Sequence, residues 1–189
     1  MGPSDRIIPH YVLNVNILGD FPPGNEIAIF GMGCFWGAER LFWNLNGVYV
    51  TAVGYAGGGI KDPTYKEVCT GTTNHSEVVL INYNPSQIKF ETLLEVFLEN
   101  HDPTQGNRQG NDIGSQYRSC IYTTIESQID IVSCKLNQFQ KSLYENGFGK
   151  ITTEIKDGVQ FYYAEEYHQQ YLAKNPNGYC GIKGTGVYC

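Results

Sequence analysis

The sequence has no long apolar run and few basic residues. No stretch approaches the roughly 18 consecutive apolar residues that mark a membrane-spanning helix, and the first residues lack the basic-then-apolar order of a secretory signal. The 13 lysines and arginines are outnumbered by 19 aspartates and glutamates, and no basic block offers a surface for a phosphate backbone. We therefore expect a cytoplasmic protein that has neither a membrane nor a nucleic acid as its partner.

The cysteines and histidines also lack the spacing of a metal site. Neither Cys-x-x-Cys nor His-x-x-x-His occurs, so no bound metal is expected. Six cysteines could form the three disulfides of a secreted binding module, but a chain of 189 residues without an export signal favours reduced thiols, some of them reactive. Cys120 falls within a predicted strand and Cys134 within a predicted helix, and these two and Cys69 are expected to be structural. The other three cysteines are Cys34, Cys180 and Cys189.

Apolar periodicity predicts one domain in which strands and helices alternate. Short apolar or alternating runs predict strands at 26–30, 48–53, 78–81, 119–122 and 151–155. Apolar residues at helical spacing predict helices at 34–46, 89–100 and 125–146, and an aromatic-rich segment predicts another at 161–172. This order indicates an α+β fold, a two-layer sandwich of the α/β type with one mixed β-sheet flanked by helices.

The two ends of the chain differ from its middle. Residues 1–24 contain several prolines and no sustained periodicity, which predicts an N-terminal arm that wraps on the surface or is partly disordered. Residues 25–174 hold the predicted elements and form the candidate catalytic domain. Residues 175–189 are rich in glycine and carry two cysteines, which predicts a flexible coil suited to moving a thiol.

Cys34 lies in the sequence GCFWG at 33–37, where a predicted strand passes through glycines into a predicted helix. Unpaired backbone N–H groups and the positive end of the helix dipole lower the pKa of a thiol from about 8.5 towards neutrality, which makes it a nucleophile. A buried cysteine beside core aromatics would have the same local sequence. The local residues alone leave both interpretations open.

Six further stretches follow GCFWG along the chain, and together the seven resemble the peptide methionine sulfoxide reductase A family. The six are GYAGG at 54–58, PTYKEV at 63–68, HSEVV at 75–79, GNDIGSQYRS at 110–119, FYYAEEYHQQ at 161–170 and NPNGYC at 175–180. The resemblance runs from about residue 26 to residue 189 and is far more specific than any one motif. It implies an oxidoreductase that reduces methionine S-sulfoxide, free or in proteins, and so repairs proteins under oxidative stress.

The resemblance implies a role for each matching residue. Cys34 attacks the sulfoxide sulfur, and Glu77 donates a proton to the sulfoxide oxygen. A carboxyl beside the apolar run 78–81 is partly desolvated, which raises its pKa towards that of a usable acid. The remaining implied roles are hydrogen bonds to the same oxygen from Tyr65 and Tyr117, an apolar wall for the S-methyl group from Phe35 and Trp36, and a polar anchor from Asp112.

The attack leaves Cys34 as a sulfenic acid, which condenses readily with a second thiol. The resemblance implies that Cys180 is this thiol and that Cys189 then displaces Cys34 by thiol–disulfide exchange. It implies thioredoxin, or dithiothreitol in vitro, as the electron donor, with no bound cofactor, and a monomer is expected. Because Cys189 stands beside the terminal carboxylate, we expect a raised pKa and slow exchange there.

Two alternatives and one departure accompany the resemblance. His168 follows Cys34 at a spacing found in papain-like proteases, although the upstream sequence of those enzymes is missing. A binding module stapled by three disulfides is the second alternative. His168 is otherwise expected to be a satisfied, partly buried histidine. Asn74 stands where the family usually has glycine, and since asparagine tolerates positive φ well, we expect the turn to survive.

Overall fold

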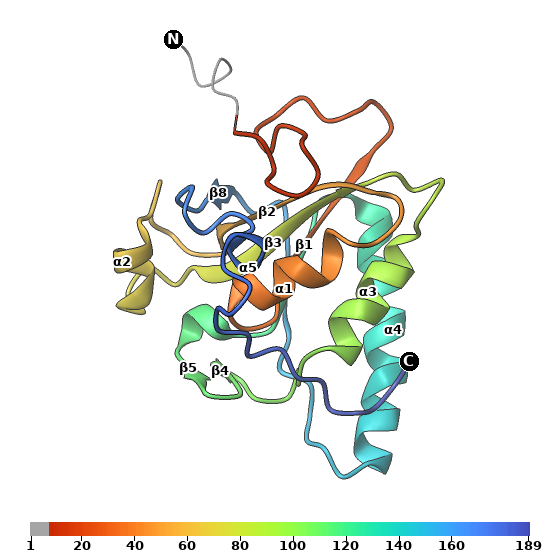
Figure 1. Cartoon of the computed structure of the whole chain (residues 1–189). Helices are drawn as coiled ribbons and strands as arrows, with labels where there is room; N and C mark the ends of the chain where they lie inside the picture. Colours follow the sequence, from red (N-terminus) through yellow and green to blue (C-terminus); the bar gives the residue numbers. More distant parts are fainter. Residues whose placement is uncertain (1–7) are drawn as a thin grey trace.

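The computed structural model describes residues 8–189, and a six-stranded sheet forms its centre (Figure 1). The strand order is β7-β6-β1-β3-β2-β8, in which only β6 and β7 run parallel. The prediction of one mixed sheet in an α+β fold is therefore confirmed. The strands are β1 (Glu26–Gly31), β2 (Val48–Ala56), β3 (Ser76–Tyr83), β6 (Cys120–Thr123), β7 (Glu154–Asp157) and β8 (Phe161–Tyr163), while β4 (Arg108–Gln109) and β5 (Asp112–Ile113) form a separate two-stranded ribbon.

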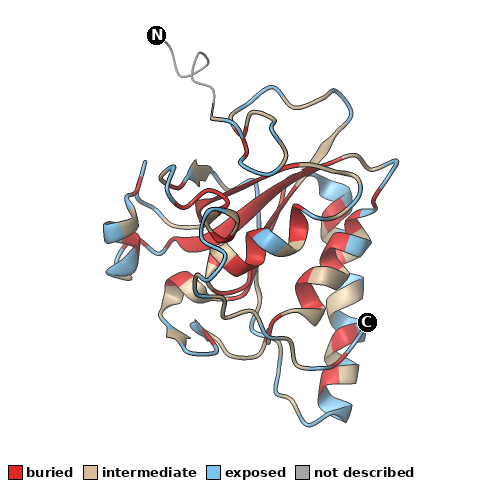
Figure 2. Cartoon of the chain, viewed as in Figure 1, coloured by how far each residue is buried: buried red, intermediate tan, exposed pale blue. Residues whose placement is uncertain are grey.

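Three helices cover one face of the sheet (Figure 1). Side chains alternate between the two faces of a strand, and Phe30, Val79 and Ile81 point towards these helices, where they pack against residues such as Phe42 and Leu143. Figure 2 shows burial concentrated along the sheet and on the helix faces turned towards it. The three helices are α1 (Phe35–Phe42), α3 (Phe90–Glu99) and α4 (Glu126–Glu145); the shorter ones are α2 (Tyr65–Cys69), the 3₁₀ turn η2 (Ser115–Tyr117) and α5 (Tyr171–Lys174).

The described part of the N-terminal segment, residues 8–24, packs on β2. Ile17 is buried against Val50 and Ala52, and the buried His10 ring shares a hydrogen bond of 3.0 Å with the Thr51 hydroxyl. The segment thus covers part of the sheet, as expected of an arm wrapped on the surface. Residues 1–7 of the predicted arm lie outside the described residues.

Two predicted elements differ from the structure. The helix predicted at 161–172 is wrong, because 161–163 form the edge strand β8, which pairs with the end of β2, and only the short helix α5 follows. Gln170, immediately before α5, has φ 49, and an α-helix cannot continue through a residue in this left-handed conformation. The strand predicted at 151–155 lies at 154–157 instead, where it pairs with β6.

The C-terminal segment, residues 175–189, runs as coil from α5 past α1 to the C-terminal end of α3, beside the middle of α4 (Figure 1). Val187 is buried in the same core cluster as α3 and α4. The Cys189 backbone N–H donates a hydrogen bond of 2.8 Å to Glu99 Oε1 on α3. In this structure the segment is therefore docked at its far end, and its flexibility stays a prediction.

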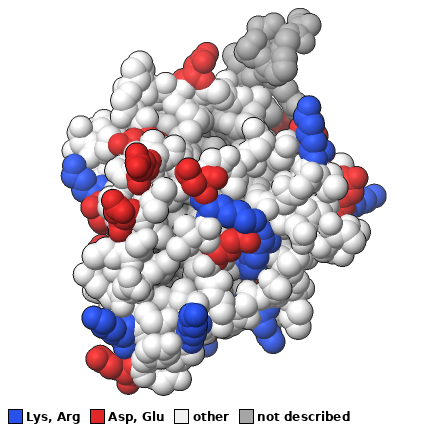
Figure 3. Space-filling view, turned by 180° about the vertical axis from the view of Figure 1, so that it is seen from behind, with Lys and Arg blue, Asp and Glu red and all other residues white. Residues whose placement is uncertain are grey.

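The described residues contain no candidate membrane span, and the face of the molecule seen in Figure 3 is not basic. Among residues 8–189, no helix is long and apolar enough to cross a membrane. On the face seen in Figure 3, basic and acidic side chains are interspersed, without a broad area of positive charge. This distribution agrees with the net charge of −6.

Candidate active site

Cys34 is the N-cap residue of α1 and is half-buried. Gly33 before it has φ +95, a conformation that favours glycine, and a Cβ there would lie 2.8 Å from the Gln109 side chain. The Cys34 side chain makes no cap hydrogen bond, so the first N–H group of α1 finds another acceptor. The Phe35 N–H donates to Glu77 Oε2 at 3.1 Å, while the Trp36 backbone N–H lies near enough to the Cys34 sulfur to favour its charged form. The N-terminal end of α1, here called the entrance of α1, therefore brings the Cys34 thiol and the Glu77 carboxyl together.

Glu77 reaches this entrance from β3. It points to the same face as Val79 and Ile81, which is the face that α1 covers, and it is only 2% exposed. Burial raises the pKa of Glu77 to about 8, although the Phe35 hydrogen bond opposes the shift, and the nearby charge of Asp112 adds to it. The prediction of a desolvated carboxyl with a raised pKa is confirmed. At neutral pH Glu77 is a carboxylic acid with a proton to donate.

The prediction of a lowered pKa for Cys34 is wrong. Burial, and then the negative charge of Glu77, raise the pKa of the Cys34 thiol well above its ordinary value, while the nearby Trp36 backbone N–H opposes them. The helix N-terminus is present as predicted, but desolvation of the charged form outweighs it. Because part of the shift comes from Glu77 in its charged form, protonation of Glu77 relieves part of the penalty on the thiolate. The two groups are coupled through their protons.

Tyr65, Tyr117 and Asp112 lie around this pair on three different elements. Tyr65 begins α2, Tyr117 ends η2 and Asp112 begins β5. Burial and the charge of Glu77 raise the pKa of the Tyr117 phenol, and burial with a hydrogen bond to Cys69 raises that of Tyr65. Both phenols are therefore neutral O–H donors over the physiological range, and the structure brings together these residues predicted for the site.

Phe35 and Trp36 form an aromatic group beside the entrance. The Trp36 indole stacks on Tyr171 with ring centres 3.8 Å apart and donates from Nε1 to His168 Nδ1 at 3.0 Å. The His168 ring also lies 5.1 Å from Phe35 and 4.6 Å from Tyr65, measured between ring centres. The predicted apolar wall residues Phe35 and Trp36 thus lie side by side. Tyr171 was not predicted, because nothing in the local sequence shows that an aromatic residue at the start of a short helix stacks on Trp36.

His168 is more deeply buried than the sequence suggested. It is 1% exposed, and its Nε2 atom has no hydrogen-bond partner within residues 8–189. Burial lowers the pKa of His168 to about 4, against the charge of Glu165. A neutral ring whose Nδ1 accepts from Trp36 is a poor base for Cys34, so this arrangement does not favour a cysteine protease.

The C-terminal segment closes the other side of the entrance. Arg40 Nη2 donates to Cys180 Sγ at 3.1 Å, and the Tyr179 hydroxyl donates to Asp112 Oδ2 at 3.0 Å. Cys180 is close enough for its charge to contribute to the raised pKa of Cys34. The structure therefore places Cys180 at the site, whereas Arg40 was not predicted, since a charged residue on an exposed helix face gives no signal.

Cys189 lies apart from this group, at the α3 end of the segment. Burial, and then the charge of Glu99, raise the pKa of Cys189 to about 11, while Lys135 opposes them. The predicted direction is confirmed, but the terminal carboxylate is not its cause. In this structure Cys189 therefore lies at Glu99 and not with Cys34 and Cys180.

Within residues 8–189, the cysteines form no disulfide, and the cysteines and acidic groups form no metal site. All six cysteines are unpaired, which is not the arrangement of a module held by three disulfides. Cys120 is buried in the sheet, and Cys69 and Cys134 are exposed on α2 and α4. Within residues 8–189, no three His, Cys, Asp or Glu side chains converge as metal ligands.

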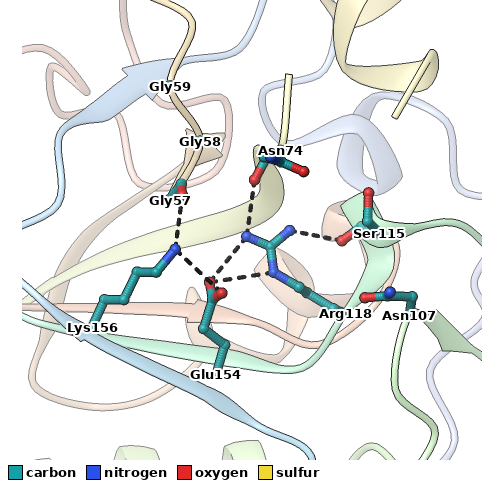
Figure 4. Close-up of a pocket in the computed structure, with 9 residues that line it drawn as sticks. All are labelled: Gly57, Gly58, Gly59, Asn74, Asn107, Ser115, Arg118, Glu154 and Lys156. Atoms are coloured by element: carbon teal, nitrogen blue, oxygen red, sulfur yellow. Dashed lines mark hydrogen bonds and ion pairs between the residues drawn. The ribbon is translucent and has the colours of Figure 1, made fainter. Parts of the chain in front are cut away.

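A cavity of about 400 Å³ opens elsewhere, between the glycines after β2 and the β6–β7 edge. Figure 4 shows Arg118, Glu154 and Lys156 pointing into it and towards one another. Arg118 Nη2 and Glu154 Oε1 lie 3.0 Å apart, and Lys156 Nζ and Glu154 Oε2 lie 3.2 Å apart. Every charged group that lines this cavity therefore has a charged partner there.

The chain matches a family model described as peptide methionine sulfoxide reductase over residues 26–186. It is 59% identical over 180 residues to the human mitochondrial peptide methionine sulfoxide reductase, covering 95% of this chain and 77% of that protein. Methionine sulfoxide reductase A of Corynebacterium diphtheriae has a similar structure, with a TM-score of 0.87 and 46% identity over 97% of this chain and 89% of the other. Reduced Mxr1 from Saccharomyces cerevisiae gives a TM-score of 0.79 and 35% identity, over 91% and 96% of the two chains. The complex of Mxr1 with Trx2 matches at 23% identity, TM-score 0.59 and coverage of 89% and 95%, which is a likeness of fold alone.

Proposed function

Because this chain belongs to the peptide methionine sulfoxide reductase A family, we propose that it reduces methionine S-sulfoxide, free or in proteins, through a thiol relay of Cys34, Cys180 and Cys189. The observation that carries the proposal is the meeting of Cys34 with a buried, protonated Glu77 at the entrance of α1. A thiol beside a proton donor is what removal of an oxygen atom from sulfur requires.

In the first step the Cys34 sulfur attacks the sulfoxide sulfur while Glu77 protonates the sulfoxide oxygen. The sulfur–sulfur bond formed in this attack breaks as the hydroxyl passes from the substrate sulfur to Cys34, and the Cys34 thiol proton replaces the proton that Glu77 gave up. Cys34 is thereby oxidised by two electrons to a sulfenic acid, and the substrate is reduced by two electrons to the thioether. Tyr65 and Tyr117, both neutral O–H donors, hold the oxygen as its charge develops. Phe35 and Trp36 receive the S-methyl group, and Asp112 orients the rest of the substrate.

In the second step the Cys180 sulfur attacks the sulfur of the sulfenic acid, the S–O bond breaks and water leaves. Cys189 then displaces Cys34 from the mixed disulfide and frees it for another cycle. The contact of Cys180 with Arg40 at the site supports the first of these transfers. The position of Cys189 beside Glu99 implies that the end of the chain moves before the second transfer.

A disulfide between Cys180 and Cys189 would be reduced by thioredoxin, with no bound cofactor. Mxr1, which in its reduced form is 35% identical to this chain, has a solved complex with Trx2, and this supports the proposed donor. We further propose that the protein acts as a monomer in the cytoplasm, although the human relative is named mitochondrial. Gel filtration tests the first statement, and microscopy of the tagged protein in its own cell tests the second.

The deciding experiment is incubation of the purified protein with racemic methionine sulfoxide and dithiothreitol, followed by chiral analysis of the remaining sulfoxide. We expect the S epimer to disappear and the R epimer to remain. A folded, fully reduced protein that consumes neither epimer would end the proposal. Loss of the R epimer alone would keep the reductase activity but reverse the assigned stereochemistry.

A further inference from the structure

The face of α1 that follows Cys34 is built to receive the C-terminal segment. Cys34, Gly37 and Arg40 are spaced three residues apart along the helix, so that they lie along one side of it. Cys34 is at its entrance, Gly37 is buried one turn on, and the exposed Arg40 lies a further turn along. The residues that contact this side include Cys180 and Ile182 from the C-terminal segment.

Gly37 provides the space for this contact. A Cβ at Gly37 would lie 3.1 Å from Cys180 Sγ and would overlap the Ile182 side chain. Any other residue at this position would push the segment away from the helix. The backbone at Gly37 is ordinary helix without a positive φ, so the conformation of the chain does not require glycine there. The approach of the segment is what requires it.

Arg40 provides the polar contact. Its Nη2 atom donates to Cys180 Sγ at 3.1 Å, across a sequence separation of 140 residues. A guanidinium stays charged at every physiological pH and keeps its donors in a fixed plane. It can therefore hold the sulfur at one place on the helix while the segment around it remains coil.

We propose that Arg40 is a positioning residue for the resolving step, and that Gly37 and Arg40 together form the docking face for Cys180. This inference rests on the proposed relay and deepens it. In the step concerned, the Cys180 sulfur bonds to the sulfur of the Cys34 sulfenic acid, the S–O bond breaks, and the hydroxyl leaves with the Cys180 proton as water. Arg40 contacts neither the substrate nor Cys34; it raises the local concentration of the Cys180 sulfur beside Cys34.

The test separates the two steps in time. In a Cys189→Ser background the relay stops at the Cys34–Cys180 disulfide, and a rapid-quench experiment without reductant measures two products. Released methionine reports the first step, and the decay of a dimedone-reactive sulfenic acid, followed by mass, reports the second. Arg40→Met keeps the length of the side chain but removes its donors, Arg40→Lys keeps a charged donor, and Lys141→Met on the exposed face of α4 is the matched control.

We expect Arg40→Met to slow the decay of the sulfenic acid by about threefold to tenfold, the effect of losing one ordinary hydrogen bond, because the contact is exposed to solvent. The methionine burst should keep its parental rate, Arg40→Lys should restore part of the loss, and Lys141→Met should behave like the parent. Decay at the parental rate in Arg40→Met would overturn the proposal. An equal slowing of burst and decay would also overturn it, because a general disturbance of α1 would then explain both.

Gly37→Ala tests the docking face independently of Arg40. Alanine favours helix more than glycine does, so α1 should remain folded while the added Cβ displaces the C-terminal segment. We expect the decay of the sulfenic acid to be about tenfold slower, with an unchanged circular dichroism spectrum. Gly149→Ala is the matched control, because nothing lies within 4 Å of a Cβ there and no positive φ is involved. Unchanged decay in Gly37→Ala would contradict the docking face.

Failure of the inference and failure of the relay have different signatures. If the parent forms no methionine burst, or if Cys180→Ser loses its sulfenic acid as fast as the parent does, the proposed function fails. If the parent resolves through Cys180 and Arg40→Met resolves equally fast, only the role of Arg40 fails.

Discussion

Carboxyl groups have opposite environments in two regions of the molecule. One region is the cavity lined by Arg118, Glu154 and Lys156, and the other is the entrance of α1, where Glu77 lies. In the cavity, burial would raise the pKa of Glu154, but hydrogen bonds from Tyr122 and Arg118 more than reverse this, and its pKa is lowered. At the entrance of α1 no cationic side chain among residues 8–189 forms an ion pair with Glu77, and burial raises the pKa of Glu77 to about 8. A carboxylate that is neutralised by partners holds a structure together, whereas a carboxyl kept neutral by burial is available for proton transfer.

The comparison also shows that open volume and chemical function need not coincide. The cavity has a volume of about 400 Å³, yet its charged groups are occupied with one another (Figure 4). The entrance of α1 combines a thiol, a buried carboxyl with a raised pKa and two neutral phenols, which belong to four separate elements of the fold. Substitutions at the two places should therefore affect different quantities, turnover at the entrance and stability at the cavity.

The largest effect is expected from Cys34→Ser. A hydroxyl at this position is too weak a nucleophile to accept the oxygen of a sulfoxide, so methionine formation should fall below detection. Product analysis after incubation with methionine sulfoxide and dithiothreitol measures this. Cys134→Ser on the exposed face of α4 is the control for removal of one thiol and should retain full activity. Appreciable turnover by Cys34→Ser would move the nucleophile to another cysteine.

Cys180→Ser should permit a single turnover. With thioredoxin as donor, the enzyme should release one methionine per chain and then stop as a Cys34 sulfenic acid, because the resolving sulfur is missing. A mass increase of one oxygen atom on the peptide containing Cys34, or its dimedone adduct, identifies this state. Continued turnover with thioredoxin would mean that another thiol, or thioredoxin itself, resolves the intermediate.

Glu77→Gln should lower kcat by about 10²–10⁴-fold, the usual range for loss of a general acid, with little change in KM. The amide has the same shape but cannot supply a proton. Steady-state kinetics over a range of sulfoxide concentrations measures both constants. A change in KM with kcat preserved would assign Glu77 to substrate binding instead.

The pH profile sharpens the assignment of Glu77. Since its pKa is about 8, the protonated form that acts as acid predominates below this pH and is lost above it. The kcat of the parent should therefore fall about tenfold per pH unit well above pH 8. In Glu77→Gln the residual rate should lack this fall. A parental profile that is flat to pH 10 would show that another group delivers the proton.

The sequence predicted what depends on neighbours along the chain. Helical periodicity and the glycines before Cys34 placed it at the entrance of α1, and the apolar run after Glu77 predicted that residue's burial and raised pKa. The family resemblance supplied the other residues of the site. The pKa of Cys34 was predicted with the wrong sign, because local sequence shows the helix N-terminus but not the extent of burial or the approach of Glu77.

The features that were missed depend on contacts between distant segments. Residues 161–163 became β8 because β2 offers an open edge there, and such pairing overrides local helix preference. The Arg40 contact with Cys180 spans 140 residues, and the stacking of Tyr171 on Trp36 depends on the turn before α5. Each requires the folded arrangement of two segments, which periodicity does not contain.

In the cavity, Glu154→Gln should lower stability and leave chemistry intact. The amide keeps the shape of the side chain but loses the charge that pairs with Arg118 and Lys156. We expect the free energy of unfolding to fall by about 1–2 kcal/mol, a value suited to a half-buried network with charged hydrogen bonds. Urea denaturation measures this. The kcat should change by less than about twofold, and a larger loss would join the cavity to the catalytic machinery.

The smallest effect is expected at Asn74, which connects the two regions. Its carbonyl accepts a hydrogen bond of 3.0 Å from Arg118 in the cavity. Glu77, which lies at the entrance of α1, follows three residues later in the sequence. Asn74 has φ 58, and glycine adopts this conformation without strain. Asn74→Gly should therefore change the free energy of unfolding by no more than about 0.5 kcal/mol and leave kcat unaltered, because the carbonyl and the turn both remain.

Asn74→Ala is the sharper variant at this turn. Alanine keeps the same carbonyl, but its Cβ is strained in a left-handed conformation. The free energy of unfolding should therefore fall by about 1 kcal/mol. Urea denaturation of the two variants side by side separates backbone strain from the hydrogen bond, which both retain. If Asn74→Gly were as destabilised as Asn74→Ala, the asparagine side chain itself would hold the turn. If either variant lowered kcat at full folding, the placement of Glu77 would depend on the cavity, and the separation of the two regions would fail.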